Sequence, residues 1–246
     1  MLAVIDQPSP NWNARVGGQP PDLVILHYTG MASSAAAIAR LCNPVAKVSS
    51  HYVIDRAGEI FRLVAEKHRA WHAGVSSWHG QTDINSRSIG IELVNPGHAH
   101  GYTDFAEPQM GSLLALLEGI CARHKIATGG VLAHSDIAPD RKSDPGERFN
   151  WERLSQAGFG LWVPPSPLQH GATLSFGQAG QEVTRLHHML SALGFGIAAS
   201  ALFDRKTEIV LRAFQRHWRP QLIDGRADAS TRDTLTRLVA VMQRPR

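Results

Sequence analysis

A proline-rich stretch divides the chain into two regions with different hydrophobic patterns. Three prolines fall within residues 161–171, which show neither strand nor helix periodicity. Proline fixes φ and lacks an amide donor, so it interrupts helices and sheets alike. The length of 246 residues suffices for two unequal domains. We therefore predict a first domain over residues 1–162, a linker over residues 163–174 and a second domain over residues 175–246.

Short apolar segments alternate with helical segments throughout the first domain. The segments that predict strands are residues 23–28, 51–56, 59–64, 88–94 and 131–134. The segments that predict helices are residues 33–42, 108–126 and 150–157. Strands interleaved with helices form an α/β fold around one sheet, and the hairpin at Ala57-Gly58 favours a mixed sheet. We predict a central mixed β-sheet flanked by helices.

The second domain changes to a purely helical pattern. Apolar residues recur at helical spacing in three segments, residues 183–193, 207–218 and 231–242. A unit of about 70 residues is near the lower limit for independent stability. We predict a small all-α three-helix module whose helices bury their apolar faces among themselves.

Charge and composition limit the function classes. Residues 168–246 carry 11 Lys and Arg against 6 Asp and Glu, whereas residues 1–167 carry 14 against 15. Basic helices can bind nucleic acid, but these basic residues are scattered between acids and have no aromatic stacking platform, so we expect no nucleic-acid partner. The apolar runs are far shorter than the ~18 residues of a membrane span. Two cysteines exclude a disulfide-dense scaffold.

The first six residues contain no basic segment, and Asp6 ends the opening apolar run. A secretory signal needs about 7–15 apolar residues after a positive segment. On this ground we expect a cytoplasmic protein, with the periplasm as the alternative.

Metal-competent side chains follow two of the predicted strands. His27 and His134 each end an apolar run, and Asp144 lies ten residues beyond His134. Two imidazoles and one carboxylate would hold zinc and leave a fourth position open for water, as catalytic zinc sites do. Taken alone, His27 would also suit a satisfied position in the core, and Asp136 and Asp140 suit a solvated surface turn.

Five segments of the first domain occur in an order that is typical of one family. They are His27-Tyr-Thr, Ser50-His-Tyr-Val-Ile-Asp, Trp71-His-Ala-Gly, Ser88-Ile-Gly-Ile-Glu-Leu-Val-Asn and His134-Ser-Asp-Ile-Ala-Pro-Asp-Arg-Lys-Ser-Asp-Pro-Gly. Over roughly residues 10–160 they resemble the type 2 zinc N-acetylmuramoyl-L-alanine amidases, which include bacterial muropeptide amidases and peptidoglycan recognition proteins. The Trp78-His79-Gly segment has no counterpart in this pattern. The second domain resembles the three-helix peptidoglycan-binding module.

The resemblance implies a role for five residues. His27, His134 and Asp144 match the family's zinc ligands, which implies one Zn²⁺ per chain. Glu92 matches the acid/base glutamate, and Lys142 matches a lysine that supports the oxyanion. Zinc lowers the pKa of its bound water to roughly 7, so this water would attack the amide while Glu92 transfers protons.

The resemblance also implies the reaction and its substrate. The enzyme would hydrolyse the amide bond between the lactyl group of muramic acid and L-alanine in peptidoglycan fragments. Together with the expected cytoplasmic location, this implies anhydro-muropeptides of cell-wall recycling as substrates. A non-catalytic peptidoglycan binder on the same fold is the alternative. It is disfavoured because the ligands, the glutamate and the lysine are all present.

Four further residues of these segments are predicted to contact substrate: His51, Trp71, His72 and Asn95. Each of them has a structural alternative, which is a hairpin core for His51, edge packing for Trp71 and His72, and a turn cap for Asn95. The His98-Ala-His100 segment has metal-like spacing but no third partner, so we expect it to be solvated.

Overall fold

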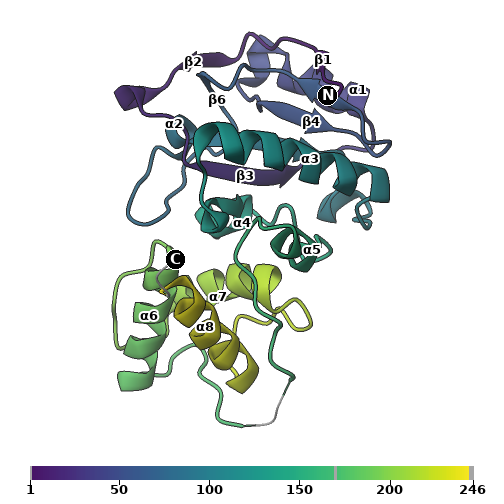
Figure 1. Cartoon of the computed structure of the whole chain (residues 1–246). Helices are drawn as coiled ribbons and strands as arrows, with labels where there is room; N and C mark the ends of the chain where they lie inside the picture. Colours follow the sequence, from purple (N-terminus) through teal and green to yellow (C-terminus); the bar gives the residue numbers. More distant parts are fainter. Residues whose placement is uncertain (1, 169–170, 244–246) are drawn as a thin grey trace.

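A six-stranded sheet forms the centre of the computed structural model, which describes residues 2–168 and 171–243 (Figure 1). Across the sheet the strands are β1 (Ile5–Asp6), β5 (Ile60–Arg62), β4 (Tyr52–Ile54), β7 (Ser88–Leu93), β3 (Leu23–Tyr28) and β8 (Val131–Ala133). Neighbouring strands are parallel except β4 and β5, which form the predicted hairpin. The prediction of a mixed sheet is therefore confirmed. A separate antiparallel pair joins β2 (Trp12–Ala14) and β6 (His68–Ala70).

Helices of the first domain lie on both faces of this sheet. They are α1 (Ser34–Leu41), α2 (Ile84–Arg87), α3 (Glu107–His124), α4 (His134–Ile137) and α5 (Trp151–Gln156). Short 3-10 helices lie at Val16–Gly18, Pro44–Ala46, His98–His100 and Thr128–Gly130. One buried apolar cluster joins Leu113 of α3 and Leu154 of α5 to the strands. The three predicted helices are present as α1, α3 and α5, whereas the short helices α2 and α4 are not predicted from the sequence.

Strand β3 is buried on both faces because its residues alternate between two apolar clusters. Val24 and Leu26 belong to the cluster that includes α3, whereas Leu23 and Ile25 belong to a second cluster. Successive side chains of a strand point to opposite faces of the sheet. A continuous apolar strand of this kind therefore needs cover on both sides.

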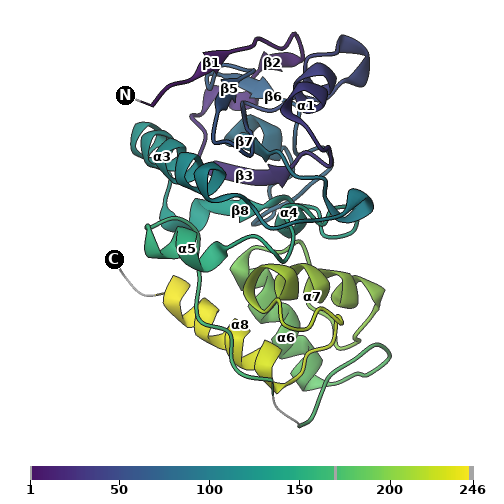
Figure 2. The same cartoon turned by 90° about the vertical axis from the view of Figure 1, so that its right-hand side faces the viewer.

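The C-terminal module, formed by α6 (Gln181–Leu193), α7 (Arg205–Trp218) and α8 (Ala229–Met242), shares that second cluster with Trp78, Ile84 and Ile137 of the first domain. The second apolar cluster joins Ile25 of β3 and Leu132 of β8 to Leu211 and Phe214 of α7. Figures 1 and 2 both show these helices against the side of the first domain that holds β8 and α4. The helices pack against one another as predicted, and in addition they bury part of their apolar faces against the first domain.

The Trp78-His79-Gly segment docks into the C-terminal module. Trp78 is 3% exposed, and its ring meets the ring of Phe195 edge-on at a centroid distance of 5.3 Å. The amide of His79 donates to the carbonyl of Gly194 at 2.9 Å. Gly194 has φ +128°, and a Cβ there would lie 2.4 Å from the Trp78 ring, so this position requires glycine. The segment that matches no part of the family pattern thus joins the two domains.

The segment between the domains has neither helix nor strand over residues 161–168. Within residues 2–168 and 171–243, no helix is long and apolar enough to span a membrane.

Candidate active site

Three adjacent strands end side by side at one edge of the sheet. In the parallel register of β3 and β7, His27 lies opposite Glu92. On the other side of β3, strand β8 ends at Ala133, and His134 follows as the first residue of α4. Open α/β sheets bind ligands beyond the carboxyl ends of their parallel strands. The sheet thus brings three of the predicted site residues to such a point.

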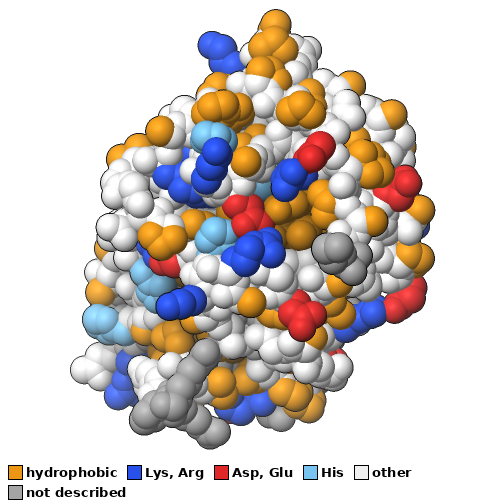
Figure 3. Space-filling model, turned by 45° about the horizontal axis from the view of Figure 1, so that its top comes forward, with side chains coloured by type: hydrophobic (Ala, Val, Ile, Leu, Met, Phe, Trp, Pro, Cys, Tyr) orange, Lys and Arg blue, Asp and Glu red, His pale blue; other side chains and the backbone are white. Residues whose placement is uncertain are grey.

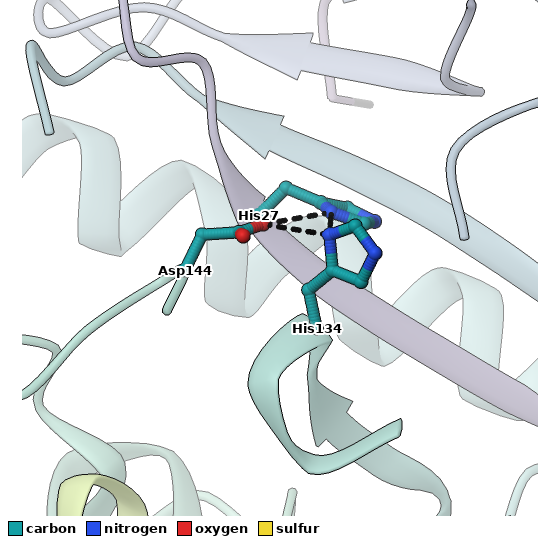
Figure 4. A group of neighbouring side chains, drawn as sticks. All are labelled: His27, His134 and Asp144. Carbon is teal, nitrogen blue, oxygen red and sulfur yellow. Dashed lines mark hydrogen bonds and ion pairs between the residues drawn. The ribbon is translucent and has the colours of Figure 1, made fainter. Parts of the chain in front are cut away.

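His27, His134 and Asp144 form a compact, buried cluster (Figure 4). The Nδ1 atoms of the two histidines are 2.9 Å apart. Oδ2 of Asp144 lies 3.0 Å from Nδ1 of His27 and 2.9 Å from Nδ1 of His134. One ligand-type atom of each residue therefore points to a single place.

Hydrogen bonds behind the cluster determine which nitrogen of His134 carries its proton. Nε2 of His134 lies 3.1 Å from the carbonyl oxygen of Ala73. A carbonyl only accepts, so Nε2 carries the proton and Nδ1 presents a lone pair to the cluster. The guanidinium of Arg141 donates to the same carbonyl, and to that of Val75 at 2.8 Å. Arg141 thereby holds the backbone segment that orients His134.

A buried chain of hydrogen bonds has the same effect on His27. The hydroxyl of Ser88 donates to the carbonyl of Ile84 at 2.6 Å, so it accepts from Nε2 of His72 at 3.2 Å. Nδ1 of His72 then accepts from Nε2 of His27 at 3.0 Å. This leaves a lone pair on Nδ1 of His27. Gly90 makes room for the chain, since a Cβ there would lie 2.4 Å from the His72 ring.

The cluster has the donor set of a cation site. Two imidazole lone pairs and one carboxylate oxygen face one another without a proton to share. Burial, helped by the neighbouring His134, lowers the pKa of His27 to about 4. Burial alone would raise the pKa of Asp144, but the two imidazoles hold it well below its ordinary value. Nitrogen and oxygen donors in this number fit zinc with a fourth position open.

Glu92 lies beside the cluster with one carboxylate oxygen unsatisfied. Its Oε2 is enclosed and has no hydrogen-bond partner among residues 2–168 and 171–243. Burial, and after it the carboxylate of Asp144, raises the pKa of Glu92 well above its ordinary value, whereas Lys142 acts in the opposite direction. A carboxyl group with a raised pKa at a site edge can accept a proton and return it.

These residues line one cleft of about 350 Å³. The predicted residues in its lining are His27, Trp71, His72, Glu92, His134, Lys142 and Asp144. Histidine, acidic and basic side chains gather around a hollow near the centre of the face in Figure 3. The cleft combines apolar and aromatic walls with a few convergent polar groups, as binding sites for small molecules do.

Two of the four predicted substrate contacts reach this cleft. The indole of Trp71 lines it, and its N–H donates to Oδ1 of Asn13 at 2.7 Å, which fixes the ring. His72 also reaches the cleft, but it is only 9% exposed. Its two nitrogens are occupied by His27 and Ser88, so its contacts orient a ligand-type histidine.

The other two, His51 and Asn95, are fully buried outside the cleft. Nδ1 of His51 accepts from the amide of Gly90 at 2.9 Å, and its Nε2 contacts the carbonyl of His68 at 3.0 Å. The side-chain amide of Asn95 donates to the carbonyl of Thr103 at 2.8 Å. Buried polar groups need such partners. The structural alternatives, a core position for His51 and a turn cap for Asn95, therefore describe the observed contacts.

Asp136 is fully buried, which corrects the expectation of a solvated surface turn. Its Oδ2 accepts the amide of Ala133 at 2.8 Å and so caps the start of α4. Asp140, in the same loop, is exposed as expected. Nothing in the local sequence separates the two acids, because burial of Asp136 depends on a distant part of the chain.

Tyr28 lines the cleft beside His27 but is not predicted as a site residue. Its hydroxyl contacts Nδ1 of His98 at 3.0 Å and Oγ of Ser143 at 3.1 Å. His98 is exposed, as expected, and also contacts Glu147 at 3.0 Å. Tyr28 directly follows His27 at the end of the same strand, and this position in the sequence could have identified Tyr28 as a site residue.

Replacement of His72 by phenylalanine tests the chain that orients His27. Phenylalanine keeps the buried ring but removes both nitrogens, so we expect zinc affinity to fall by about 10–100-fold. Competition with a chromophoric chelator measures this affinity. His51→Phe is the matched control, since His51 is also a buried histidine and bonds to no residue of the cluster. Equal affinities in wild type and His72→Phe would contradict the orienting role.

Comparison with known families confirms the resemblance seen in the sequence. The N-acetylmuramoyl-L-alanine amidase family matches residues 17–147, and a peptidoglycan binding domain matches residues 179–235. The N-acetylmuramoyl-L-alanine amidase AmiD of Escherichia coli (strain K12) is 34% identical over 221 residues, which cover 85% of this chain and 79% of AmiD. The 1,6-anhydro-N-acetylmuramyl-L-alanine amidase AmpD of the same strain is 35% identical over 164 residues, covering 60% of this chain and 87% of AmpD.

Solved structures are similar over both domains. A complex of E. coli AmiD with the substrate anhydro-N-acetylmuramic acid-L-Ala-D-γ-Glu-L-Lys has a TM-score of 0.78 and 33% identity, covering 93% of this chain and 92% of that one. AmpDH3 of Pseudomonas aeruginosa in complex with anhydromuramic pentapeptide has a TM-score of 0.75 and 29% identity, covering 94% of this chain and 95% of that one.

Proposed function

Since this chain belongs to the N-acetylmuramoyl-L-alanine amidase family, we propose that its cleft hydrolyses the amide bond between the lactyl group of muramic acid and L-alanine. The substrates are soluble anhydro-muropeptides released during turnover of the cell wall. One zinc ion per chain is the cofactor, held by His27, His134 and Asp144.

The observation that carries the proposal is the cluster of three lone-pair atoms beside an unsatisfied carboxylate. Nδ1 of His27, Nδ1 of His134 and Oδ2 of Asp144 lie within 4.8 Å of one another, and Oε2 of Glu92 lacks a partner among the described residues. An amide is a poor electrophile with a poor leaving group. Its hydrolysis needs an activated water molecule and a proton for the departing nitrogen, and these two features supply both.

When bound, zinc polarises a carbonyl and lowers the pKa of a coordinated water molecule from 15.7 to roughly 7. Glu92 takes the proton of the attacking water and later delivers it to the departing nitrogen of alanine. The raised pKa of Glu92 favours holding the proton between these two steps. His72 and the carbonyl of Ala73 keep His27 and His134 in the tautomer that presents Nδ1.

Lys142 supplies positive charge to the oxyanion that forms when water adds to the amide. It lines the same cleft as the cluster, and its backbone amide donates to the carbonyl of Ala138 at 3.0 Å, which anchors the loop. Groups placed where such charge develops are worth about 10²–10³ in rate.

The substrate class is supported by what similar proteins bind. The structure of AmiD holds an anhydro-N-acetylmuramic acid tripeptide, and AmpD is named for 1,6-anhydro-N-acetylmuramyl-L-alanine. Similarity of residues 179–235 to a peptidoglycan binding domain supports contact with the glycan or the peptide of such a fragment. The cytoplasmic location is part of the proposal, and the periplasm is the alternative that fractionation of native cells would reveal.

Product analysis on two substrates tests this proposal. The purified protein is incubated with an anhydro-N-acetylmuramoyl tripeptide and, in parallel, with intact cell-wall sacculi. Mass spectrometry should detect free tripeptide and anhydro-N-acetylmuramic acid, and the soluble fragment should react faster. Peptide release from sacculi alone would contradict the substrate class. Cleavage between two amino acids would contradict the amidase assignment.

A further inference from the structure

His217 of the C-terminal module is buried against the first domain, and the proposed reaction makes no use of it. Its side chain and that of Asp136 are both 0% exposed, with Nδ1 of His217 and Oδ2 of Asp136 2.8 Å apart. The His217 ring is stacked between the rings of Trp151 and Trp218. Its centroid lies 3.7 Å from the ring centroid of Trp151 and 3.6 Å from that of Trp218. This contact joins α7 of the module to α4 of the first domain.

Asp136 links this contact to the backbone of the first proposed metal ligand. The same oxygen, Oδ2, accepts the amide of Ala133 at 2.8 Å. Ala133 directly precedes His134, the first residue of α4. A carboxylate at this position stabilises the first turn of a helix because that turn has free amide groups. Asp136 therefore fixes the turn from which the His134 side chain projects.

The same turn also holds the loop of the second proposed ligand. The amide of Ser135 donates to the carbonyl oxygen of Asp144 at 3.0 Å. Ser135 lies between His134 and Asp136, so a shift of this turn would move two of the three atoms of the cluster. Because this one turn positions both His134 and Asp144, the metal affinity of the cluster depends on the contacts that hold the turn in place.

We propose that His217 is a positioning residue of the metal site, acting through Asp136 on His134 and Asp144. The C-terminal module is then part of the hydrolytic site as well as a binding module. The inference rests on the proposed function insofar as the cluster binds zinc.

Loss of the His217 donor would leave Asp136 poorly satisfied. Its Oδ1 already lacks a hydrogen-bond partner within the described part of the chain. Without His217, the amide of Ala133 would be the only hydrogen-bond partner left to the buried carboxyl group among the residues that the structure describes. A buried polar group that loses its partner is costly, so Asp136 would turn toward water and release the cap on α4.

Two substitutions separate the hydrogen bond from the packing. His217→Phe keeps a ring between the two tryptophans but removes the donor, whereas His217→Asn keeps an amide donor but removes the stacking. If His217 positions the ligands, zinc affinity measured by chelator competition should fall about 10–100-fold in His217→Phe. In His217→Asn it should stay within about tenfold of wild type. The reverse order would overturn the proposal, because it would assign the effect to packing.

His187→Phe is the matched control inside the module. His187 is 1% exposed, and its partners, Thr207 and the amide of Ser200, belong to the module. We expect this variant to lower the melting temperature without changing zinc affinity. Equal losses of affinity in His187→Phe and His217→Phe would overturn the positioning role. Because no substrate is used, the result is separate from the test of the reaction, and a wild-type chain that binds no zinc would reject the proposed cofactor.

Discussion

Alanine in place of any one of His27, His134 or Asp144 removes zinc bound at one ion per chain and nearly all amidase activity. Each of these residues contributes one of three atoms that lie 2.9–3.0 Å apart. Two remaining donors hold the ion poorly, because a catalytic zinc site uses three protein ligands. The loss in kcat/KM should exceed about 10³-fold, since zinc shifts the pKa of its water from 15.7 to roughly 7.

Metal analysis by mass spectrometry together with turnover of a soluble anhydro-muropeptide measures both effects. Asp140→Ala is the matched control, because Asp140 is an exposed acid of the same loop. It should keep full zinc and full activity. A variant of His27, His134 or Asp144 that retained both zinc and turnover would show that its residue is not a ligand.

Glutamine in place of Glu92 leaves zinc binding intact and lowers kcat by about 10²–10⁴-fold. Glutamine has nearly the same shape as glutamate but cannot take up and return a proton. Glu92 stands opposite His27 on the neighbouring strand and outside the three-atom cluster, so the metal should stay. Zinc content and kcat are measured on the same preparation.

Glu118→Gln is the control for Glu92, because Glu118 is an exposed residue of α3. It should leave both quantities unchanged. If Glu92→Gln lost its zinc, Glu92 would belong to the metal site. If its kcat stayed close to that of wild type, another group would act as the acid and base.

The sequence predicts the framework of the site because ligand-type residues follow strand-like segments. His27 and His134 both end apolar runs, and the parallel pairing of β3 with β8 brings these two ends together. The strand containing Glu92 is equally clear in sequence, and its register sets Glu92 opposite His27. Local hydrophobic pattern thus suffices to identify these three strands, whereas the short strands β1, β2 and β6 are not predicted from it.

The supporting contacts are not predictable in this way, because they depend on which segments become neighbours in space. His72 bonds to His27 across 45 residues of sequence, and its second partner, Ser88, begins another strand. As a result, His72, which is predicted to contact substrate, instead bonds to His27 and orients it.

The position of the C-terminal module shows the same limit. Its helices are visible in the sequence, but their packing in one cluster with Ile25 and Leu132 of the sheet is not. The burial of Asp136 follows from that packing, since its partner His217 is 81 residues away. The local sequence around Asp136 and His217 carries no information about this contact.

Release of free peptide from a soluble anhydro-muropeptide tests the central claim most directly. The reaction is followed with the purified chain, after removal of its metal with a chelator, and after return of one equivalent of zinc. We predict cleavage at the lactyl–L-alanine bond by the purified chain, none after chelation, and recovery when zinc is returned. Undiminished release from a chain shown to be free of metal would contradict a zinc-dependent amidase.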